Sequence, residues 1–174
     1  YNILAALAVM SINIDITKLD KKVFFNFTTP QGRGDLSRIK INKKNINLID
    51  ESYNSNPLSL KSAILKYDKV QSKKFKKYLL LGDMLELGTH SKKLHQSIVP
   101  IINKTKINKI FLKGNNISQI FKRIVKSKRG KVFRTNSQMI KFIKNDLNNN
   151  DYLMVKASNA TGFNKMINDL KGIK

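Results

Sequence analysis

The chain contains no cysteine among its 174 residues. Disulfide bonds, thiolate catalysis and zinc sites built on cysteine are therefore excluded within this sequence. Histidine is also scarce, because only His90 and His95 occur. Their spacing is not the i, i+4 separation that places two ligands on one face of a helix, so we expect no metal site built on them.

Long apolar runs are absent as well. No stretch approaches the ~20 residues that a membrane-spanning helix needs. Residues 3–9 are apolar but too few, and they lack the basic leader of a signal peptide. We therefore expect a cytoplasmic protein without membrane insertion. The hydrophobic share of 41% is sufficient for a packed core, and the length allows one full domain plus part of another.

Negative charge is scarce: 11 acidic residues face 34 lysines and arginines, which gives a formal net charge of +23. Such a balance invites a nucleic-acid interpretation. Lysine greatly outnumbers arginine, however, and is spread along the chain beside abundant Asn and Ile, as an AT-rich genome encodes. Nucleic-acid recognition usually concentrates arginine and aromatic residues on one surface. We expect no nucleic-acid partner, and a basic binding module remains an alternative function.

The N-terminal apolar pattern predicts helices that belong to a separate unit. Residues 2–12 read as a buried helix that is apolar nearly all round, and residues 16–27 as a second, amphipathic helix. The stretch 29–34 contains one proline and two glycines, which mark a turn. We place a domain boundary there, between residues 1–34 and 35–174.

The rest of the pattern predicts an α/β domain. Asn56 can cap a helix that begins at Pro57, where the missing N–H of proline does no harm. Strands that alternate with helices favour a Rossmann-like, mostly parallel sheet covered by helices on both faces. The predicted strands are residues 36–41, 46–50 (joined to the first by a turn at 42–45), 78–81, 109–112, 132–133 and 152–155. The further predicted helices start near Thr89 and at 117–124, 139–147 and 163–170.

Ligands bind at the carboxyl ends of the strands in such sheets. This rule selects three loops, at residues 50–57 (DESYNSNP), 81–88 (LGDMLELG) and 155–160 (VKASNA). Carboxylates and asparagines beside a helix start can hold ribose and phosphate groups, and lysine can meet a carboxylate or phosphate. The alternative is that these residues are helix caps and packing groups. No Gly-x-x-x-x-Gly-Lys-Ser/Thr phosphate loop occurs, so the chain alone should not be a competent ATPase.

Taken in order, these segments resemble the Mur ligase family. Residues 48–57 match the family signature Asp-Asp/Glu-Ser-Tyr-Asn-Ala-Asn-Pro, with Ser55 in place of Ala. Residues 81–88, with Leu94-His95, match a segment typical of the branch that uses D-alanyl-D-alanine. Weaker matches are Asn2-Ile3-Leu4-Ala5-Ala6 with a helix of the central ATP-binding domain, Gly32-Arg33 with the entry to the C-terminal domain, and Lys156-Ala157-Ser158 with a terminal Lys-Gly-Ser.

The resemblance implies that the chain is the C-terminal part of a larger bacterial ligase, and that residues 35–174 are its C-terminal domain. Such a ligase uses ATP with Mg²⁺, held mainly by an upstream domain, to join D-alanyl-D-alanine to UDP-N-acetylmuramoyl-tripeptide, and we expect a monomer. No catalytic or metal-binding residue is implied within this chain. The implied nucleotide-binding residues are Asn2, Arg33, Asp50, Glu51, Tyr53, Asn54 and Asn56. The implied substrate-binding residues are Asp83, Glu86, His95, Lys156 and Ser158.

Two points stay open. A related Mur ligase or a folylpolyglutamate-type ligase is the alternative within the superfamily. Ala157 stands where the family has glycine, and its Cβ could obstruct a close approach of a ligand to the backbone.

Overall fold

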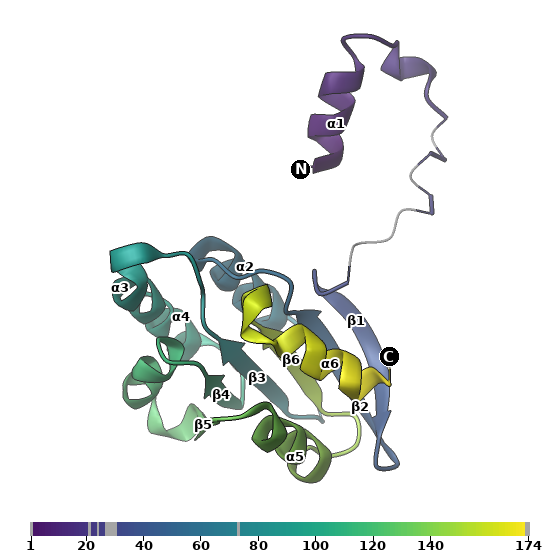
Figure 1. Ribbon diagram of the computed structural model, residues 1–174. Helices are drawn as coiled ribbons and strands as arrows, with labels where there is room; N and C mark the ends of the chain where they lie inside the picture. Colours follow the sequence, from purple (N-terminus) through teal and green to yellow (C-terminus); the bar gives the residue numbers. More distant parts are fainter. Residues whose placement is uncertain (1, 21, 24, 27–30, 73, 173–174) are drawn as a thin grey trace.

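The computed structural model describes residues 2–20, 22–23, 25–26, 31–72 and 74–172, apart from the side chain of Asn2. Its centre is a sheet of six described strands in the order β1-β2-β6-β3-β4-β5. The β1–β2 pair is antiparallel and every other neighbouring pair is parallel, which confirms the predicted mostly parallel sheet (Figure 1). The strands are β1 (Asp35–Ile41), β2 (Lys44–Glu51), β3 (Lys77–Gly82), β4 (Lys109–Lys113), β5 (Arg129–Val132) and β6 (Tyr152–Lys156).

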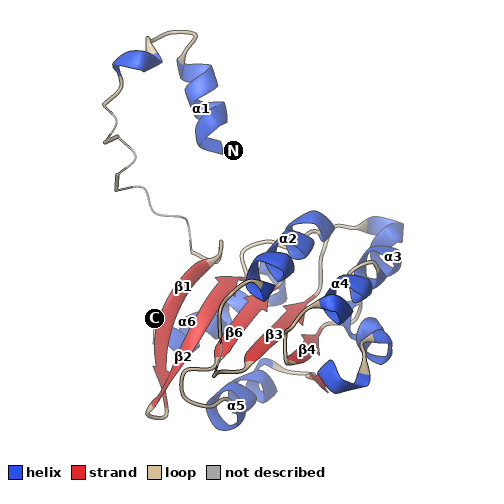
Figure 2. Ribbon diagram, turned by 180° about the vertical axis from the view of Figure 1, so that it is seen from behind, coloured by secondary structure: helices blue, strands red, loops and turns tan. Residues whose placement is uncertain are grey.

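Helices cover both faces of the sheet (Figures 1 and 2). One face carries α2 (Pro57–Asp68), α3 (Ser91–Gln96), α4 (Val99–Lys104) and the 3₁₀ helix η3 (Ile117–Arg123); the other carries α5 (Asn136–Asp146) and α6 (Phe163–Lys171). The strands bury side chains on both sides, so the sheet separates two hydrophobic cores. This arrangement is the one that alternating strands and helices predict.

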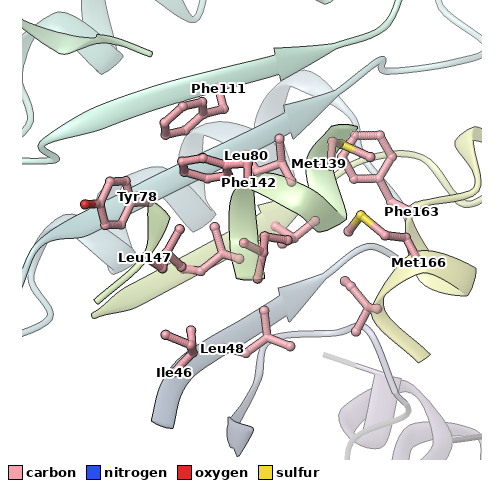
Figure 3. Packing of buried hydrophobic residues seen from close by; sticks show 14 of the residues in the cluster. Ile46, Leu48, Tyr78, Leu80, Phe111, Met139, Phe142, Leu147, Phe163 and Met166 are labelled. Atoms are coloured by element: carbon pink, nitrogen blue, oxygen red, sulfur yellow. The ribbon is translucent and has the colours of Figure 1, made fainter. Parts of the chain in front are cut away.

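The core under α5 and α6 is rich in aromatic rings (Figure 3). Phe111 of β4 lies 4.1 Å from Phe142 of α5 between ring centroids and 5.6 Å from Phe133. Tyr78 of β3 meets Phe142 edge-on. Aromatic pairs at such separations add stability beyond the area that they bury, so this cluster fixes α5 against β3 and β4.

The start of α2 follows the sequence prediction. The Asn56 side chain accepts a hydrogen bond from the Ser59 N–H, while the Ser59 hydroxyl accepts one from the Asn56 N–H, and Pro57 occupies the first helical position. The helix buries Leu60, Ala63, Ile64 and Tyr67, which recur at the spacing of one helical face. Capping thus sets the direction in which the chain leaves the end of β2.

Several predicted elements differ from the structure. The β1–β2 turn is limited to Asn42 and Lys43, both at positive φ, rather than residues 42–45. The helix expected from Thr89 is divided into η2 (Gly88–His90), α3 and α4, because Pro100 lacks the N–H that would continue one helix. Residues 117–123 form a 3₁₀ helix, and β5 lies at Arg129–Val132 rather than 132–133.

The N-terminal predictions were partly wrong. The helix α1 (Asn2–Met10) forms, but its apolar side chains are not buried: Leu4 is 65% and Val9 64% exposed. Of the second helix, expected at residues 16–27, only the short 3₁₀ helix η1 (Ile16–Lys18) occurs among the described residues, and residues 21, 24 and 27 lie outside them. Figure 1 shows α1 standing apart from the sheet. Among the residues that the structure describes, no element covers these apolar side chains.

We predict that Gly82→Ala destabilises the domain by about 1–3 kcal/mol, as overpacking does in a close-packed core. A Cβ at position 82 would lie 2.6 Å from the Ala157 Cβ and 2.8 Å from the Phe163 ring. Adding Ala157→Gly should recover part of the loss, because it removes one of the two clashes. Urea denaturation of both variants checks this. Equal stability of the single and double variants would contradict the assigned contact.

Candidate functional site

The three loops selected from the sequence meet at one edge of the sheet. Strand β6 lies between β2 and β3, with Val155 paired to Asp50 on one side and to Leu80 on the other. The loops that follow these strands therefore emerge side by side at their carboxyl ends, the position at which parallel sheets bind ligands.

Lys156 joins two of these loops. Its ammonium group donates hydrogen bonds to the Glu51 carboxylate (3.3 Å) and to the backbone oxygen of Asn54 (2.8 Å), and the residue is 1% exposed. Burial lowers the pKa of Lys156, and the negative charge of Glu51 opposes this shift. Two of the expected ligand-binding residues thus bind one another, and the pair holds the β2–α2 loop against the end of β6.

Asp50 also has internal partners. One carboxylate oxygen accepts hydrogen bonds from the N–H (3.0 Å) and the hydroxyl (2.6 Å) of Ser52, and the other lies 3.4 Å from the Lys171 ammonium. Lys171, in the last turn of α6, also contacts Asp35 at 3.2 Å. Asp50 is 1% exposed, so in this structure it shapes the loop rather than presenting a free carboxylate.

Four of the expected nucleotide-binding residues face solvent, namely Arg33, Tyr53, Asn54 and Asn56. Tyr53 is 44% exposed, and the Arg33 guanidinium lies 4.3 Å above the centre of its ring, within the range of a cation–π contact. Asn54 is exposed, with its side-chain oxygen bonded to the Ser55 N–H. Asn56 is exposed but acts as the cap of α2. The side chain of Asn2 lies outside the described part of the chain.

Asp83, expected to bind substrate, caps a helix instead. Its carboxylate accepts backbone N–H groups from Asn115 (2.9 Å), Asn116 (3.1 Å) and Ile117 (2.7 Å) at the start of η3. Successive N–H groups of this kind form an anion-binding concavity. A side chain of the protein itself fills it, and Gly114, at φ +143°, leaves room for the carboxylate. The β4–η3 turn is therefore closed to an external phosphate.

Ser158 and His95 both support the loop after β3. The Ser158 hydroxyl accepts a hydrogen bond from the Leu85 N–H (3.0 Å) and donates one to the backbone oxygen of Ser55 (3.2 Å). The His95 ring is fully buried, with Nε2 3.0 Å from the Met84 nitrogen and Nδ1 2.7 Å from the Ser91 oxygen. Each side chain thus has its polar atoms committed to backbone groups, those of two loops for Ser158 and those of Met84 and Ser91 for His95.

Glu86 is the exception among the expected substrate-binding residues. It is exposed at the tip of the same loop, at φ +62°, and its carboxylate has no partner among the contacts of the described residues. It borders a pocket of about 450 Å³ at the carboxyl edge. The lining residues of this pocket, which we call the edge groove, are Tyr53, Asn54, Leu85, Glu86, Ser158, Asn159 and Ala160.

The edge groove continues into two further hollows. One, of about 290 Å³, shares Tyr53 and Asn159 with it and reaches Gln31 and Asp50. The other, of about 570 Å³, shares Leu85 and Ala160 and reaches Lys113 and Arg134. Asn159 and Ala160 were not identified from the sequence as site residues, although they directly follow the selected Ser158. Loop position was the available signal.

Ala157 does not obstruct the edge groove. The residue is fully buried, and its Cβ faces Gly82 in the interior of the domain. The extra methyl group of Ala157 is therefore accommodated because the residue opposite it, Gly82, has no side chain.

The described residues do not form a magnesium site. No three His, Asp or Glu side chains among them gather closely enough to hold a metal ion. At the carboxyl edge Asp50, Glu51 and Asp83 are occupied by lysines or backbone N–H groups, which leaves one free carboxylate where Mg²⁺ prefers several oxygen ligands. The described helices also include none that is long and apolar enough to span a bilayer.

A larger hollow lies elsewhere. A pocket of about 600 Å³ occupies the opposite edge, where the strands begin, and its lining includes Lys69, Lys74, Lys76, Lys77 and Lys106. Lys77 is satisfied there by Asp68 at 3.7 Å and by the Asp68 backbone oxygen. Size alone is a weak criterion, and the position at the strand starts argues against a ligand site in a parallel sheet. We therefore assign the candidate site to the edge groove.

Fold and site together define an α/β domain with a polar ligand groove at the carboxyl edge of a Rossmann-like sheet. Residues 36–159 match the family model described as "Mur ligase, glutamate ligase domain". The chain belongs to the Mur ligase family.

Individual relatives agree with this assignment. A UDP-N-acetylmuramoyl-tripeptide–D-alanyl-D-alanine ligase of Buchnera aphidicola (subsp. Acyrthosiphon pisum) is 36% identical over 125 residues, covering 71% of this chain and 26% of the relative. The ligase of the same name from Rickettsia prowazekii is 27% identical over 150 residues, covering 86% and 32%. The chain thus spans about a quarter to a third of the length of these relatives.

Solved structures show the same fold. A MurF ligase from Thermotoga maritima in complex with ADP superposes with a TM-score of 0.71 at 21% identity, covering 99% of this chain and 37% of that one. A MurF from Acinetobacter baumannii gives a TM-score of 0.72 at 18% identity, covering 94% and 35%.

We predict that Asp83→Ala lowers the free energy of unfolding by about 2–3 kcal/mol, because three backbone N–H groups lose a charged acceptor. Glu86→Gln should leave stability unchanged, since this side chain is exposed and unpaired. Thermal and urea denaturation of the two variants, followed by circular dichroism, makes the comparison. Equal stability of Asp83→Ala and the wild type would contradict the capping role.

Proposed function

We propose that this chain is part of an ATP-dependent ligase that adds D-alanyl-D-alanine to UDP-N-acetylmuramoyl-tripeptide in peptidoglycan precursor synthesis. The names of the curated relatives support the substrates, and the family supports a ligase reaction. The observation that carries the proposal to this chain is the unpaired Glu86 carboxylate at the edge groove, beside Tyr53 and Asn54.

The proposed reaction has two steps. ATP first transfers its terminal phosphate to the carboxylate of the tripeptide, which gives an acyl phosphate and ADP. The ammonium group of D-alanyl-D-alanine first loses a proton to solvent, and the neutral amine attacks the acyl carbon. The nitrogen of the tetrahedral intermediate releases a second proton to solvent, and the intermediate collapses to the amide as phosphate leaves. The attacking nitrogen must be held about 3–3.5 Å from the acyl carbon and aligned with it, so placing the amine is the task of a dedicated site.

Glu86 suits the arriving amine. A carboxylate attracts the ammonium form of the dipeptide and can hold the amine by a charge-assisted hydrogen bond. Tyr53 and Asn54 line the edge groove, and Arg33 stacks on the Tyr53 ring. These three residues would face the nucleotide. Asp50, Glu51, Asn56, Asp83, Lys156 and Ser158 would act through these residues by fixing the loops.

Residues 1–34 would belong to a separate ATP-binding unit. The exposed apolar side chains of α1 favour this, because such a surface needs a partner. That unit would also supply the magnesium ligands that the described residues lack. Closure of the two units over the groove would exclude water from the acyl phosphate.

A substrate panel tests the proposal. The complete ligase that contains this chain is given UDP-N-acetylmuramoyl-tripeptide, ATP and one of three amines: D-alanyl-D-alanine, diaminopimelate or glutamate. Phosphate release and product mass should show amide formation with D-alanyl-D-alanine. A preference for either other amine would support the related Mur or folylpolyglutamate-type ligase instead.

We predict that Glu86→Gln raises the KM for D-alanyl-D-alanine by about tenfold, because the ammonium loses a charged partner worth roughly 1.5 kcal/mol. The KM for ATP should stay the same. Asp146→Asn, which removes an exposed carboxylate from α5, is the matched control and should match the wild type. An unchanged dipeptide KM in Glu86→Gln would remove this residue from the site.

A further inference from the structure

The loop that carries Glu86 is anchored at three successive residues, each by a different element. The Asp83 carboxylate binds the start of η3, the Met84 N–H donates to His95 of α3, and the Leu85 N–H donates to Ser158 after β6. The backbone oxygen of Asp83 also accepts a hydrogen bond from the Ser158 N–H at 3.1 Å. The first residue beyond these anchors is Glu86, which turns into a left-handed conformation.

The contact from His95 differs from the others because its chemistry depends on one tautomer. Nδ1 lies 2.7 Å from the Ser91 backbone oxygen, which can only accept a hydrogen bond, so Nδ1 carries the proton. Nε2 then has a free lone pair that accepts the Met84 N–H at 3.0 Å. The Asp83 carboxylate lies 3.9 Å from Nε2.

A buried backbone N–H without an acceptor is costly, so the loss of Nε2 would leave Met84 unpaired or force the loop to move. The displacement would pass directly along the chain to Glu86, two residues on. His95 itself is fully buried and lines none of the hollows of the carboxyl edge. It therefore has no route to direct contact with substrate in this structure.

We infer that His95 is a positioning residue: as the neutral Nδ1–H tautomer it holds the Met84 backbone, and thereby places the Glu86 carboxylate to receive the amine of the dipeptide. This inference rests on the proposed function. It replaces the expectation that His95 binds substrate itself.

Three substitutions separate this role from simple core packing. His95→Gln can place an amide oxygen near the position of Nε2 and so keep the acceptor for Met84. His95→Leu fills a similar volume but offers no acceptor, and His95→Asn is too short to reach Met84. If His95 positions Glu86, His95→Leu and His95→Asn should raise the KM for D-alanyl-D-alanine about fivefold to tenfold, with little change in the KM for ATP. His95→Gln should stay within about twofold of the wild type.

The assays are run on the complete ligase well below the melting temperature of every variant. Similar losses in His95→Gln and His95→Leu, or an equal rise in the KM for ATP, would show general disruption and overturn the inference. Unchanged kinetics in all three variants would overturn it as well. A core-packing residue would give losses that follow the melting temperatures rather than the presence of an acceptor.

A second measurement does not depend on activity. Nitrogen-15 NMR of the histidine ring in this chain should show a protonated Nδ1 and an unprotonated Nε2. Protonation at Nε2 would overturn the inference even in an active enzyme. If the ligase proved inactive with D-alanyl-D-alanine while the expected tautomer was present, the proposed function would fail and the loop anchor would stand.

Discussion

A buried ammonium group needs a counter-charge and hydrogen-bond acceptors, and Lys156 finds them in Glu51 at the end of β2 and in Asn54 of the loop that follows. The strand register places Lys156 directly opposite Glu51, so the ion pair forms only when β2 and β6 are paired correctly. Removal of either partner would leave an uncompensated charge or carboxylate at a mostly buried position. The position of the β2–α2 loop, which supplies Tyr53 and Asn54 to the edge groove, therefore depends on the sheet register itself.

The polar residues of this edge divide into two groups with different tasks. The first group forms hydrogen bonds and ion pairs within the protein and thereby holds the three loops together. Its members are Asp50, Asp83, His95, Lys156 and Ser158. Four residues lie on the outside of that framework with side chains exposed to solvent, namely Arg33, Tyr53, Asn54 and Glu86. A rigid inner set that supports a small outer set is the arrangement that precise substrate placement requires.

Much of the fold was predictable because its signals are local. The cap at Asn56 with Pro57 next to it, the period of the α2 apolar face and the short buried strands all lie within a few residues of the elements that they specify. The meeting of the three selected loops was also predictable, since parallel strands present their carboxyl ends at one edge. The division of the helix at Pro100 could have been read from the same rules.

The direction of individual side chains was not predictable. Asp83 and Glu86 lie in one loop and look alike in sequence, yet one is drawn to the N–H groups of η3, which are about thirty residues away in the chain, and the other is left free. Likewise, the sequence of a short segment such as α1 shows that the helix is apolar, but it does not show which surface covers the helix. Contacts between residues far apart in the chain determine both the direction of a side chain and what covers an apolar segment. The periodicity of the sequence does not predict such contacts.

The central claim is that the carboxyl edge, with Glu86 at its free tip, receives the amine substrate. The most direct test is a two-dimensional ¹H–¹⁵N NMR titration of this chain with D-alanyl-D-alanine. The account predicts shifts that centre on the backbone amides of the edge groove, at Leu85, Glu86, Asn159 and Ala160. Shifts that centre on the lysine-lined pocket at the opposite edge, or none at the carboxyl edge, would contradict it.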